Sequence, residues 1–294
     1  MGTLSISNVS KTYPNGVKAL NNVSLEIKNG MFGLLGPNGA GKSSLMRTLA
    51  TLQDADSGMI RLNDIDVLNN PIEIRKVLGY LPQEFGVYPS ISAEQLLNHL
   101  AILKGISNNR ERKNLVKYLL HKVNLYHKRN KHVKGFSGGM KQRLGIAQAL
   151  IGNPKLVIVD EPTAGLDPGE RNRFYNLLSD LGEKAIVILS THIVDDVREL
   201  CTKMAIMHSG EIVYHGSPQK AIDELKGKVY QKIVNRHQLD EYAKNYSIIS
   251  NKMVGGQPLI HVLSEDHPQD GFEQVSPNLE DVFFSRINTL NVVV

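Results

Sequence analysis

Apolar and polar residues alternate along residues 4–28, with Leu4 and Ile6 in the first half and Val23, Leu25 and Ile27 in the second. Alternation with a period of two is typical of a strand that has one buried face. A Pro-Asn-Gly turn at residues 14–16 separates the halves. We therefore predict an antiparallel strand pair joined by this turn, with residues 58–63 adding another strand.

Short apolar runs at residues 31–35, 156–159 and 185–189 show a second pattern. Such short runs indicate strands that are buried on both faces, as in parallel sheets. Residues 44–49 follow the first run with helical spacing. Residues 31–80 and 150–215 are therefore predicted to supply a parallel α/β core.

Helical spacing dominates between about residues 86 and 145, most clearly in residues 93–100 and 115–120. A hairpin over residues 204–214 is predicted to follow the core, and then a helix over 219–226. The tail mixes strand-like runs at 229–234 and 258–263 with short helical stretches. We expect a small α/β appendage there, so the predicted division is residues 1–225 and 226–294.

The composition is that of a soluble globular protein, with 294 residues, 41% hydrophobic and 21% charged. No apolar stretch approaches 20 residues, so no transmembrane helix is predicted. Residues 1–6 lack the basic region and apolar core of a signal peptide. The single cysteine, Cys201, is expected to be a buried thiol in a reducing compartment.

The net charge of +5 raises the question of an anionic partner, either nucleic acid or lipid. The densest basic region is residues 128–134. It lacks the interleaved aromatic residues of a single-strand binding platform, which favours a solvated surface.

Residues 36–43 read GPNGAGKS and fit the phosphate-loop pattern G-x-x-x-x-G-K-[ST]. Glycines let the backbone wrap around a polyphosphate, and the helix N-terminus faces its negative charge. In such a loop Lys42 reaches the β- and γ-phosphates and the Ser43 hydroxyl ligates Mg²⁺. A chance glycine loop is the alternative, but the predicted strand before the motif and helix after it favour a phosphate site.

The aliphatic run at 156–159 ends in two acids, Asp160 and Glu161. The carboxyl edge of a parallel sheet is where α/β proteins place ligands. Asp160 is then predicted to hold Mg²⁺ through water, and Glu161 to polarise an attacking water. Read alone, the run is better explained as a strand that ends in a polar turn, and it is the phosphate loop upstream that favours the functional roles.

Residues 136–143 read FSGGMKQR and precede a helical stretch at 144–150. The hydroxyl of Ser137 and the exposed N–H groups of Gly138 and Gly139 form a helix start that suits a phosphate. Alone this segment is a plain capped helix. Together with the phosphate loop upstream and the acidic strand end downstream, it resembles an ABC-type ATPase cassette over about residues 3–225.

The resemblance implies roles for further positions in the correct chain order. It implies that Tyr13 stacks on adenine and that Gln83 is the Q-loop glutamine. It also implies that residues 164–167 are the D-loop and that His192 is the switch histidine. It places the nucleotide contacts at Tyr13, Gly36, Asn38, Gly39, Ala40, Gly41, Lys42, Ser43, Ser44, Ser137, Gly138 and Gly139, the Mg²⁺ ligands at Ser43, Gln83 and Asp160, and the catalytic groups at Lys42, Gln83, Glu161 and His192.

Two features resemble the subunits of ABC-2-type exporters. Met140 stands where the commonest form of the signature has glutamine, and methionine does not supply the amide group of glutamine. Residues 277–283 read PNLEDVF, which is similar to a C-terminal motif of that subgroup.

The resemblance implies an ATP-binding and ATP-hydrolysing subunit that pairs with a second copy or a homologue. It also implies a separately encoded membrane permease, a cytoplasmic position on the inner face of the membrane and no nucleic-acid partner. One alternative is a non-transport ABC ATPase that acts on ribosomes or nucleic acid. A P-loop kinase or GTPase is the other, and it leaves residues 137–139 and His192 unexplained. The transported substrate stays open.

Overall fold

The computed structural model of the chain describes residues 2–83, 86, 90–163 and 166–291, with the backbone alone for 288–291. The chain divides into two compact units, Met1–Ile212 and Val213–Val294. The predicted boundary after residue 225 therefore lies within the second unit. Within the described residues, no helix has the length and apolar character needed to cross a membrane.

The first sheet is antiparallel, as the alternating pattern predicts. Its order is β2-β1-β4-β5, with β1 Thr3–Thr12, β2 Lys18–Lys28, β4 Ser57–Leu62 and β5 Ile65–Asp66. In the turn between β1 and β2, the Gly16 amide donates to the Tyr13 carbonyl at 2.9 Å. Because β4 pairs with β1, it is the additional strand predicted over residues 58–63. Residues 57–66 therefore belong to this sheet, although they lie within the range 31–80 that was assigned to the parallel core.

The second sheet supplies the predicted parallel core. Its order is β10-β9-β3-β8-β7-β6, with β3 Gly30–Leu35, β6 Leu78–Leu81, β7 Leu156–Asp160, β8 Ile186–Thr191, β9 Lys203–His208 and β10 Glu211–Gly216. Strands β6, β7, β8, β3 and β9 run parallel to one another. Every residue of β7 and β8 is buried, which accounts for the unbroken aliphatic runs.

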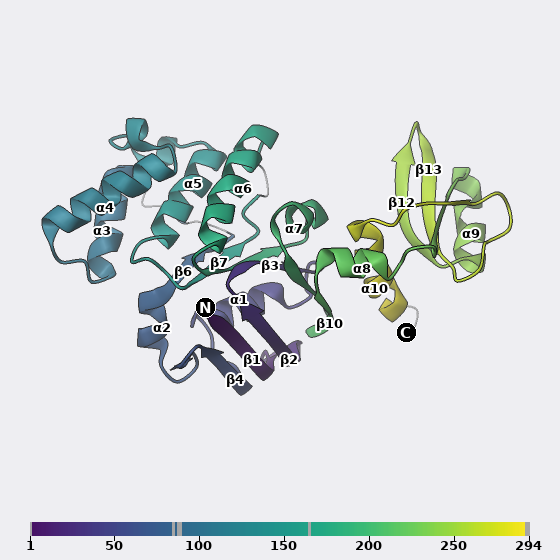
Figure 1. Cartoon of the computed structure of the whole chain (residues 1–294), viewed down its shortest axis with the longest axis horizontal. Helices are drawn as coiled ribbons and strands as arrows, with labels where there is room; N and C mark the ends of the chain where they lie inside the picture. Colours follow the sequence, from purple (N-terminus) through teal and green to yellow (C-terminus); the bar gives the residue numbers. More distant parts are fainter. Residues whose placement is uncertain (1, 84–85, 87–89, 164–165, 292–294) are drawn as a thin grey trace. The chain divides into compact units, whose positions relative to one another are not determined.

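Helix α1 (Lys42–Leu49) shares one core with both sheets (Figure 1). Leu45, Met46 and Leu49 are buried in the same cluster as Leu4 of β1 and Ile158 of β7. This packing fixes the start of α1, and with it the phosphate loop, at the edge of the parallel sheet.

Helices α6 (Pro168–Gly182) and α7 (Val194–Leu200) contact β3 and β8. The approach of α7 is so close that a Cβ on Gly33 of β3 would lie 2.8 Å from a Val197 methyl group. Cys201, directly after α7, is buried as predicted, and burial raises the pKa of its thiol.

The first unit further contains α2 (Pro71–Val77), α3 (Ala93–Leu103), α4 (Asn109–Lys122) and α5 (Gly138–Ala149), all labelled in Figure 1. Helices α3, α4 and α5 contact one another, and each begins at a polar cap: Ser92, Asn108 and Ser137. This arrangement gives the helical region expected over 86–145, of which residues 87–89 lie outside the described part. Short 3₁₀ turns span Tyr126–Lys128 and Val133–Gly135.

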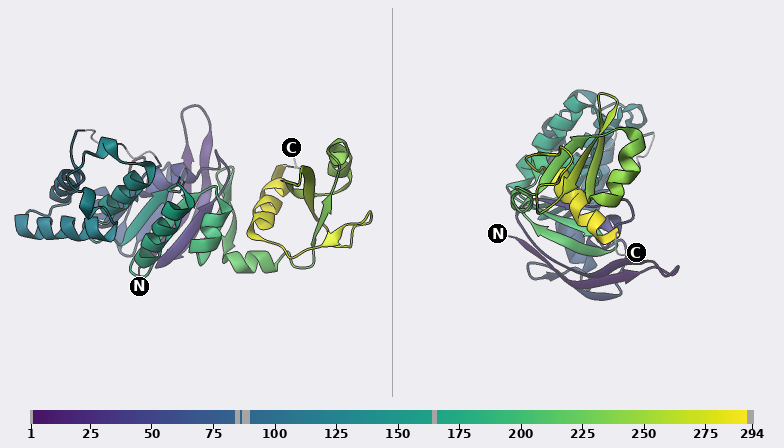
Figure 2. Two further views of the ribbon diagram at one scale, coloured as in Figure 1. Left: turned by 90° about the horizontal axis from the view of Figure 1, so that it is seen from above. Right: turned by 90° about the vertical axis from the view of Figure 1, so that its right-hand side faces the viewer.

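The second unit is an antiparallel sheet with short helices, drawn in two further views in Figure 2. The sheet order is β12-β13-β11-β14, with β11 Val229–Ile233, β12 Ile248–Val254, β13 Gln257–Leu263 and β14 Glu273–Gln274. The helices are α8 (Pro218–Asp223), α9 (Leu239–Asn245) and α10 (Leu279–Asn291), with a 3₁₀ turn at Arg236–Gln238. Strand β12 escaped prediction because its last four residues are exposed and carry no alternation.

Helix α10 begins at the PNLEDVF motif and buries its apolar stripe of Leu279, Val282, Phe283 and Ile287. Asp281 is 1% exposed, and its Oδ1 lies 2.7 Å from Nδ1 of His261 in β13. Its Oδ2 accepts the Asn278 amide at 2.9 Å, so one carboxylate caps the helix and ties it to the sheet.

We predict that Asp281→Ala destabilises the second unit by about 3 kcal/mol, because it leaves a buried histidine without its partner. Urea unfolding together with amide exchange in α10 measures this effect. Glu280→Ala is the matched control, since Glu280 contacts the half-exposed Lys252 and should cost less than about 1 kcal/mol. Equal losses in the two variants would contradict the assigned role of Asp281.

Candidate functional site

Four parallel strands end at one edge of the second sheet, and each is followed by a segment predicted to carry chemistry. Strand β3 leads into the phosphate loop, β6 toward Gln83, β7 into Glu161 and β8 into His192. A cavity of about 690 Å³ lies there. Its lining residues are Tyr13, Val17, Lys18, Ala19, Asn38, Gly39, Ala40, Gly41, Lys42, Ser43, Ser44, Gln83, Glu161 and Ser209.

The phosphate loop needs glycine for two different reasons. Gly39 and Gly41 have φ values of +81° and +106°, in the left-handed region that side chains disfavour. A Cβ on Gly41 would also lie 2.3 Å from the Ala19 carbonyl oxygen, and one on Gly36 would lie 2.5 Å from that of Met207. The loop is therefore pressed against the backbones of β2 and β9.

Lys42, the first residue of α1, is 5% exposed. Its Nζ donates to the carbonyl oxygens of Gly36 at 2.7 Å and Pro37 at 3.0 Å. Burial lowers the pKa of Lys42, and the charges of Glu161 and Asp160 oppose that shift. The ammonium group is thus held inside its own loop, facing the cavity that a polyphosphate would fill.

Three of the predicted site residues lie close to the carboxylate of Glu161. Gln83 Nε2 donates to Oε2 at 2.9 Å, and His192 Nδ1 lies 3.1 Å from Oε1. Lys42 Nζ lies 4.0 Å from the same Oε1. Glu161 itself has φ +45°, a left-handed conformation that is uncommon for this residue type and is often found at functional sites.

Asp160, one residue earlier, is 4% exposed. Burial and the nearby charge of Glu161 raise the pKa of its carboxyl group, while Ser190, Lys42 and Ser43 act in the opposite direction. No group in the described part of the chain forms a hydrogen bond with Asp160 Oδ1. A buried carboxylate oxygen without a donor suits a hard cation such as Mg²⁺, so this chain's residues fit the predicted metal.

Tyr13 lies at the cavity with its hydroxyl group fixed. The hydroxyl is 3.0 Å from Ser44 Oγ and donates to Gln53 Oε1 at 3.1 Å. Gln53 in turn donates to the Ser44 carbonyl at 3.0 Å. Gln53 was missed in the sequence because it belongs to no motif. The stacking of Tyr13 on adenine stays a prediction.

The signature residues 137–139 are not among the residues that line this cavity. Ser137 caps α5, accepting the Met140 amide at 3.3 Å. Gly138 is exposed, whereas a Cβ on Gly139 would lie 2.8 Å from Glu170 Oε2. In the D-loop, Ala164 and Gly165 lie outside the described residues, and Asp167 caps α6 by accepting the Glu170 amide at 2.8 Å.

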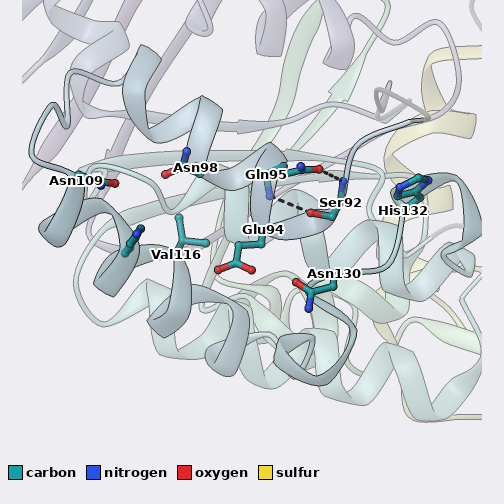
Figure 3. Close-up of a pocket in the computed structure, with 9 residues that line it drawn as sticks. Ser92, Glu94, Gln95, Asn98, Asn109, Val116, Asn130 and His132 are labelled. Carbon is teal, nitrogen blue, oxygen red and sulfur yellow. Dashed lines mark hydrogen bonds between the residues drawn. The ribbon is translucent and has the colours of Figure 1, made fainter.

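A second cavity, of about 480 Å³, lies in the helical region between α3, α4 and residues 130–132 (Figure 3). Its lining is mostly polar. Gln95 Oε1 accepts the Ser92 backbone amide at 2.9 Å, and Ser92 Oγ accepts the Gln95 backbone amide at 3.2 Å. Nothing in the sequence pointed to this cavity.

Comparisons with known proteins agree with this geometry. Residues 20–164 match a protein-family model described as ABC transporter. The chain is 33% identical to the uncharacterized ABC transporter ATP-binding protein YxlF of Bacillus subtilis, over 97% of this chain and 99% of that protein. The chain belongs to the ABC transporter ATP-binding protein family.

Other relatives of this ABC protein differ in the transport that their names describe. The Nod factor export ATP-binding protein I of Rhizobium etli is 33% identical over 96% of this chain and 92% of its own length. The methionine import ATP-binding protein MetN of Helicobacter pylori is 31% identical over 98% and 91%.

Among solved structures, a dimeric post-hydrolysis state of the ATP-binding cassette MJ0796, bound to ADP and Pi, has a TM-score of 0.67. It is 27% identical in sequence and covers 73% of this chain and 98% of that one. The predicted α/β P-loop cassette fold is confirmed, and this chain is an ATP-binding subunit of an ABC transporter.

The two loop glycines allow a matched comparison. Gly39→Ala adds a Cβ in open space and should destabilise the conformation of the loop by about 1 to 2 kcal/mol, because of its left-handed backbone alone. Gly41→Ala adds the clash with the Ala19 carbonyl, so we expect its ATP affinity to be at least about tenfold lower than that of Gly39→Ala. Isothermal titration with ATP measures both variants, and equal affinities would contradict the steric account of this loop.

Proposed function

We propose that this ATP-binding subunit hydrolyses Mg-ATP in the cavity at the carboxyl edge of the parallel sheet and thereby drives export through a separate membrane permease. The observation that carries the proposal is the convergence of Lys42, Gln83 and His192 on the carboxylate of Glu161, whose side chain is 12% exposed. Such a group of a cation, a base and hydrogen-bonding side chains is what phosphoryl transfer to water requires.

Glu161 is assigned as the general base. Its Oε2 is held by Gln83 and its Oε1 by His192, so the carboxylate is oriented before a water arrives. A proton leaving the attacking water passes to this carboxylate. His192, whose side chain is 44% exposed, is assigned to contact the γ-phosphate oxygens.

Lys42 is assigned to the β- and γ-phosphates. Among the described residues its Nζ donates hydrogen bonds to two neutral carbonyl groups, which leaves a third proton for a phosphate oxygen. Asp160, Ser43 and Gln83 are assigned to Mg²⁺, which supplies positive charge against the phosphate oxygens when bound. The remaining nucleotide contacts are proposed at Tyr13, Gly36, Asn38, Gly39, Ala40, Gly41 and Ser44.

The signature is assigned to a second subunit's nucleotide, in a head-to-tail pair of identical or homologous chains. Two facts support this arrangement. Residues 137–139 do not line their own chain's cavity, although Gly138 is exposed at the positive end of α5. The solved cassette MJ0796 with the same fold is a dimer.

Export is favoured over import by the FSGGM signature and the PNLEDVF motif, which resemble ABC-2-type exporters, and by the relative named for Nod factor export. The methionine importers among the relatives make import the second candidate. In either direction the permease would hold the chain at the inner face of the membrane. Co-purification of the tagged chain from membranes with a polytopic partner tests this arrangement against a free, non-transport ATPase.

The base assignment predicts that Glu161→Gln keeps ATP binding and loses turnover at least ~100-fold, about 2.7 kcal/mol of barrier. The amide preserves the shape of the side chain but does not accept the proton. Phosphate release measures the loss of turnover, and nucleotide affinity measured on the same sample checks that ATP binding is kept. Turnover close to that of the wild type would exclude Glu161 as the base.

The head-to-tail assignment predicts complementation between two inactive variants. Lys42→Ala removes a phosphate contact, and Gly138→Asp places a carboxylate where the partner's γ-phosphate should lie, in space free of this chain's own atoms. In a mixed pair one site keeps both an intact loop and an intact signature. An equal mixture should therefore hydrolyse ATP although neither variant does alone; a mixture as inactive as its components would count against an identical head-to-tail pair.

A further inference from the structure

Asp196 in α7 is fully buried, with 0% of its surface exposed, yet it is an acidic residue. Its carboxylate accepts five hydrogen bonds from four side chains. The donors are Thr163 Oγ1 at 2.5 Å, Thr191 Oγ1 at 3.1 Å, Tyr175 Oη at 2.5 Å, and Arg171 Nε and Nη2 at 3.2 and 2.7 Å. A charge taken out of water is tolerated only with such complete pairing.

The donors to Oδ2 come from the two segments that carry the catalytic pair. Thr163 lies two residues after Glu161, and Thr191 directly precedes His192. The Thr191 hydroxyl also accepts the Ile193 amide at 2.9 Å, so it holds the backbone on both sides of His192. One carboxylate oxygen thus bridges the loop that presents Glu161 and the loop that presents His192.

The donors to Oδ1 are Arg171 and Tyr175, both in α6. Helix α6 is itself fixed to α5 by the neighbouring Glu170, whose Oε2 lies 3.0 Å from Arg143 Nε. Asp196 is therefore anchored to a packed helix on one side and to both catalytic loops on the other.

The adjacent residue gives the natural contrast. Asp195 is 58% exposed, and its one ion pair with a described residue is with Arg198, at 3.1 Å. Asp196 occurs three residues after Ile193 and four before Leu200, on the face of α7 where an aliphatic residue would be expected. A buried charge on that face calls for a role that an aliphatic side chain would not fill.

We propose that Asp196 is a positioning residue for ATP hydrolysis, which sets the His192–Glu161 contact by holding Thr191 and Thr163. It touches neither the cavity nor the reacting groups. The inference rests on the proposed function for its kinetic test, but the placement of His192 is measurable without hydrolysis.

The kinetic test uses the hydroxyl next to His192. Thr191→Val removes the hydrogen bond to Asp196 but keeps the carboxylate paired with Arg171, so the fold should survive. We expect kcat to fall about tenfold or more, with KM for ATP within about threefold, because misplaced catalytic groups affect the reaction more than binding. Thr191→Ser restores the hydroxyl and should recover most of the rate. Asp195→Asn is the exposed control and should behave as the wild type.

A double-mutant cycle separates positioning from general stability. If Asp196 acts through His192, Asp196→Asn lowers kcat in the wild type but adds little in a His192→Ala background. An equal loss in both backgrounds would overturn the proposal, because a merely structural role does not depend on His192.

A measurement free of turnover completes the test. In ¹⁵N-histidine-labelled protein without nucleotide, the His192 ring signal is assigned by its loss in His192→Ala. It should shift in Thr191→Val and Asp196→Asn, return in Thr191→Ser and stay in place in Asp195→Asn. An unshifted signal in folded Thr191→Val refutes the positioning role. If the wild type does not hydrolyse ATP but the shifts are observed, the proposed function is rejected and the placement of His192 by Asp196 stands.

Discussion

The carboxylate of Glu161 is the group on which the arrangement of the site depends. Three side chains from three different strand ends meet it: Lys42 after β3, Gln83 after β6 and His192 after β8. These contacts exist only because the parallel register aligns the carboxyl ends of β6, β7, β8 and β3 at one edge. Because the carboxylate is only 12% exposed, its interactions with these groups are stronger than in water.

The residues around this centre form a second layer that keeps it in place. Lys42 is folded back onto the carbonyl groups of its loop, and Gly41 lets that loop lie against β2. Behind the loops, Asp196 collects hydroxyl and guanidinium donors from three segments. In such a network the loss of one donor disturbs the others, so the energetic contributions of the single hydrogen bonds are not additive.

Much of the fold was predictable because local patterns and tertiary environment agree. The aliphatic runs of β7 and β8 are buried on both faces, and the alternation of β1 and β2 matches a sheet with one buried face. The phosphate loop was predictable for a similar reason, since its glycines answer local steric needs. Prediction failed where a contact joins distant residues, as Gln53 to Tyr13 and Asp196 to Thr163, and it failed at β12, whose last four residues are exposed and carry no alternation. None of these pairings leaves a periodic trace in the sequence.

The second unit shows how a motif can be explained without chemistry at the nucleotide. In the PNLEDVF motif, Asn278 and Asp281 cap α10, and Asp281 also holds the buried His261 of the sheet. The apolar members of the motif face the same interior. The motif is thus accounted for by the folding of this unit.

The central claim is that the position of the Glu161 carboxylate, and not merely its charge, makes this edge of the sheet an ATPase centre. Single-turnover hydrolysis of radiolabelled ATP by Glu161→Asp tests it most directly, since this change keeps the charge and withdraws the carboxylate by one methylene group. The account predicts unchanged ATP affinity and hydrolysis slowed at least about tenfold, because the contacts with Gln83 and His192 are lost. Hydrolysis at the wild-type rate would contradict it.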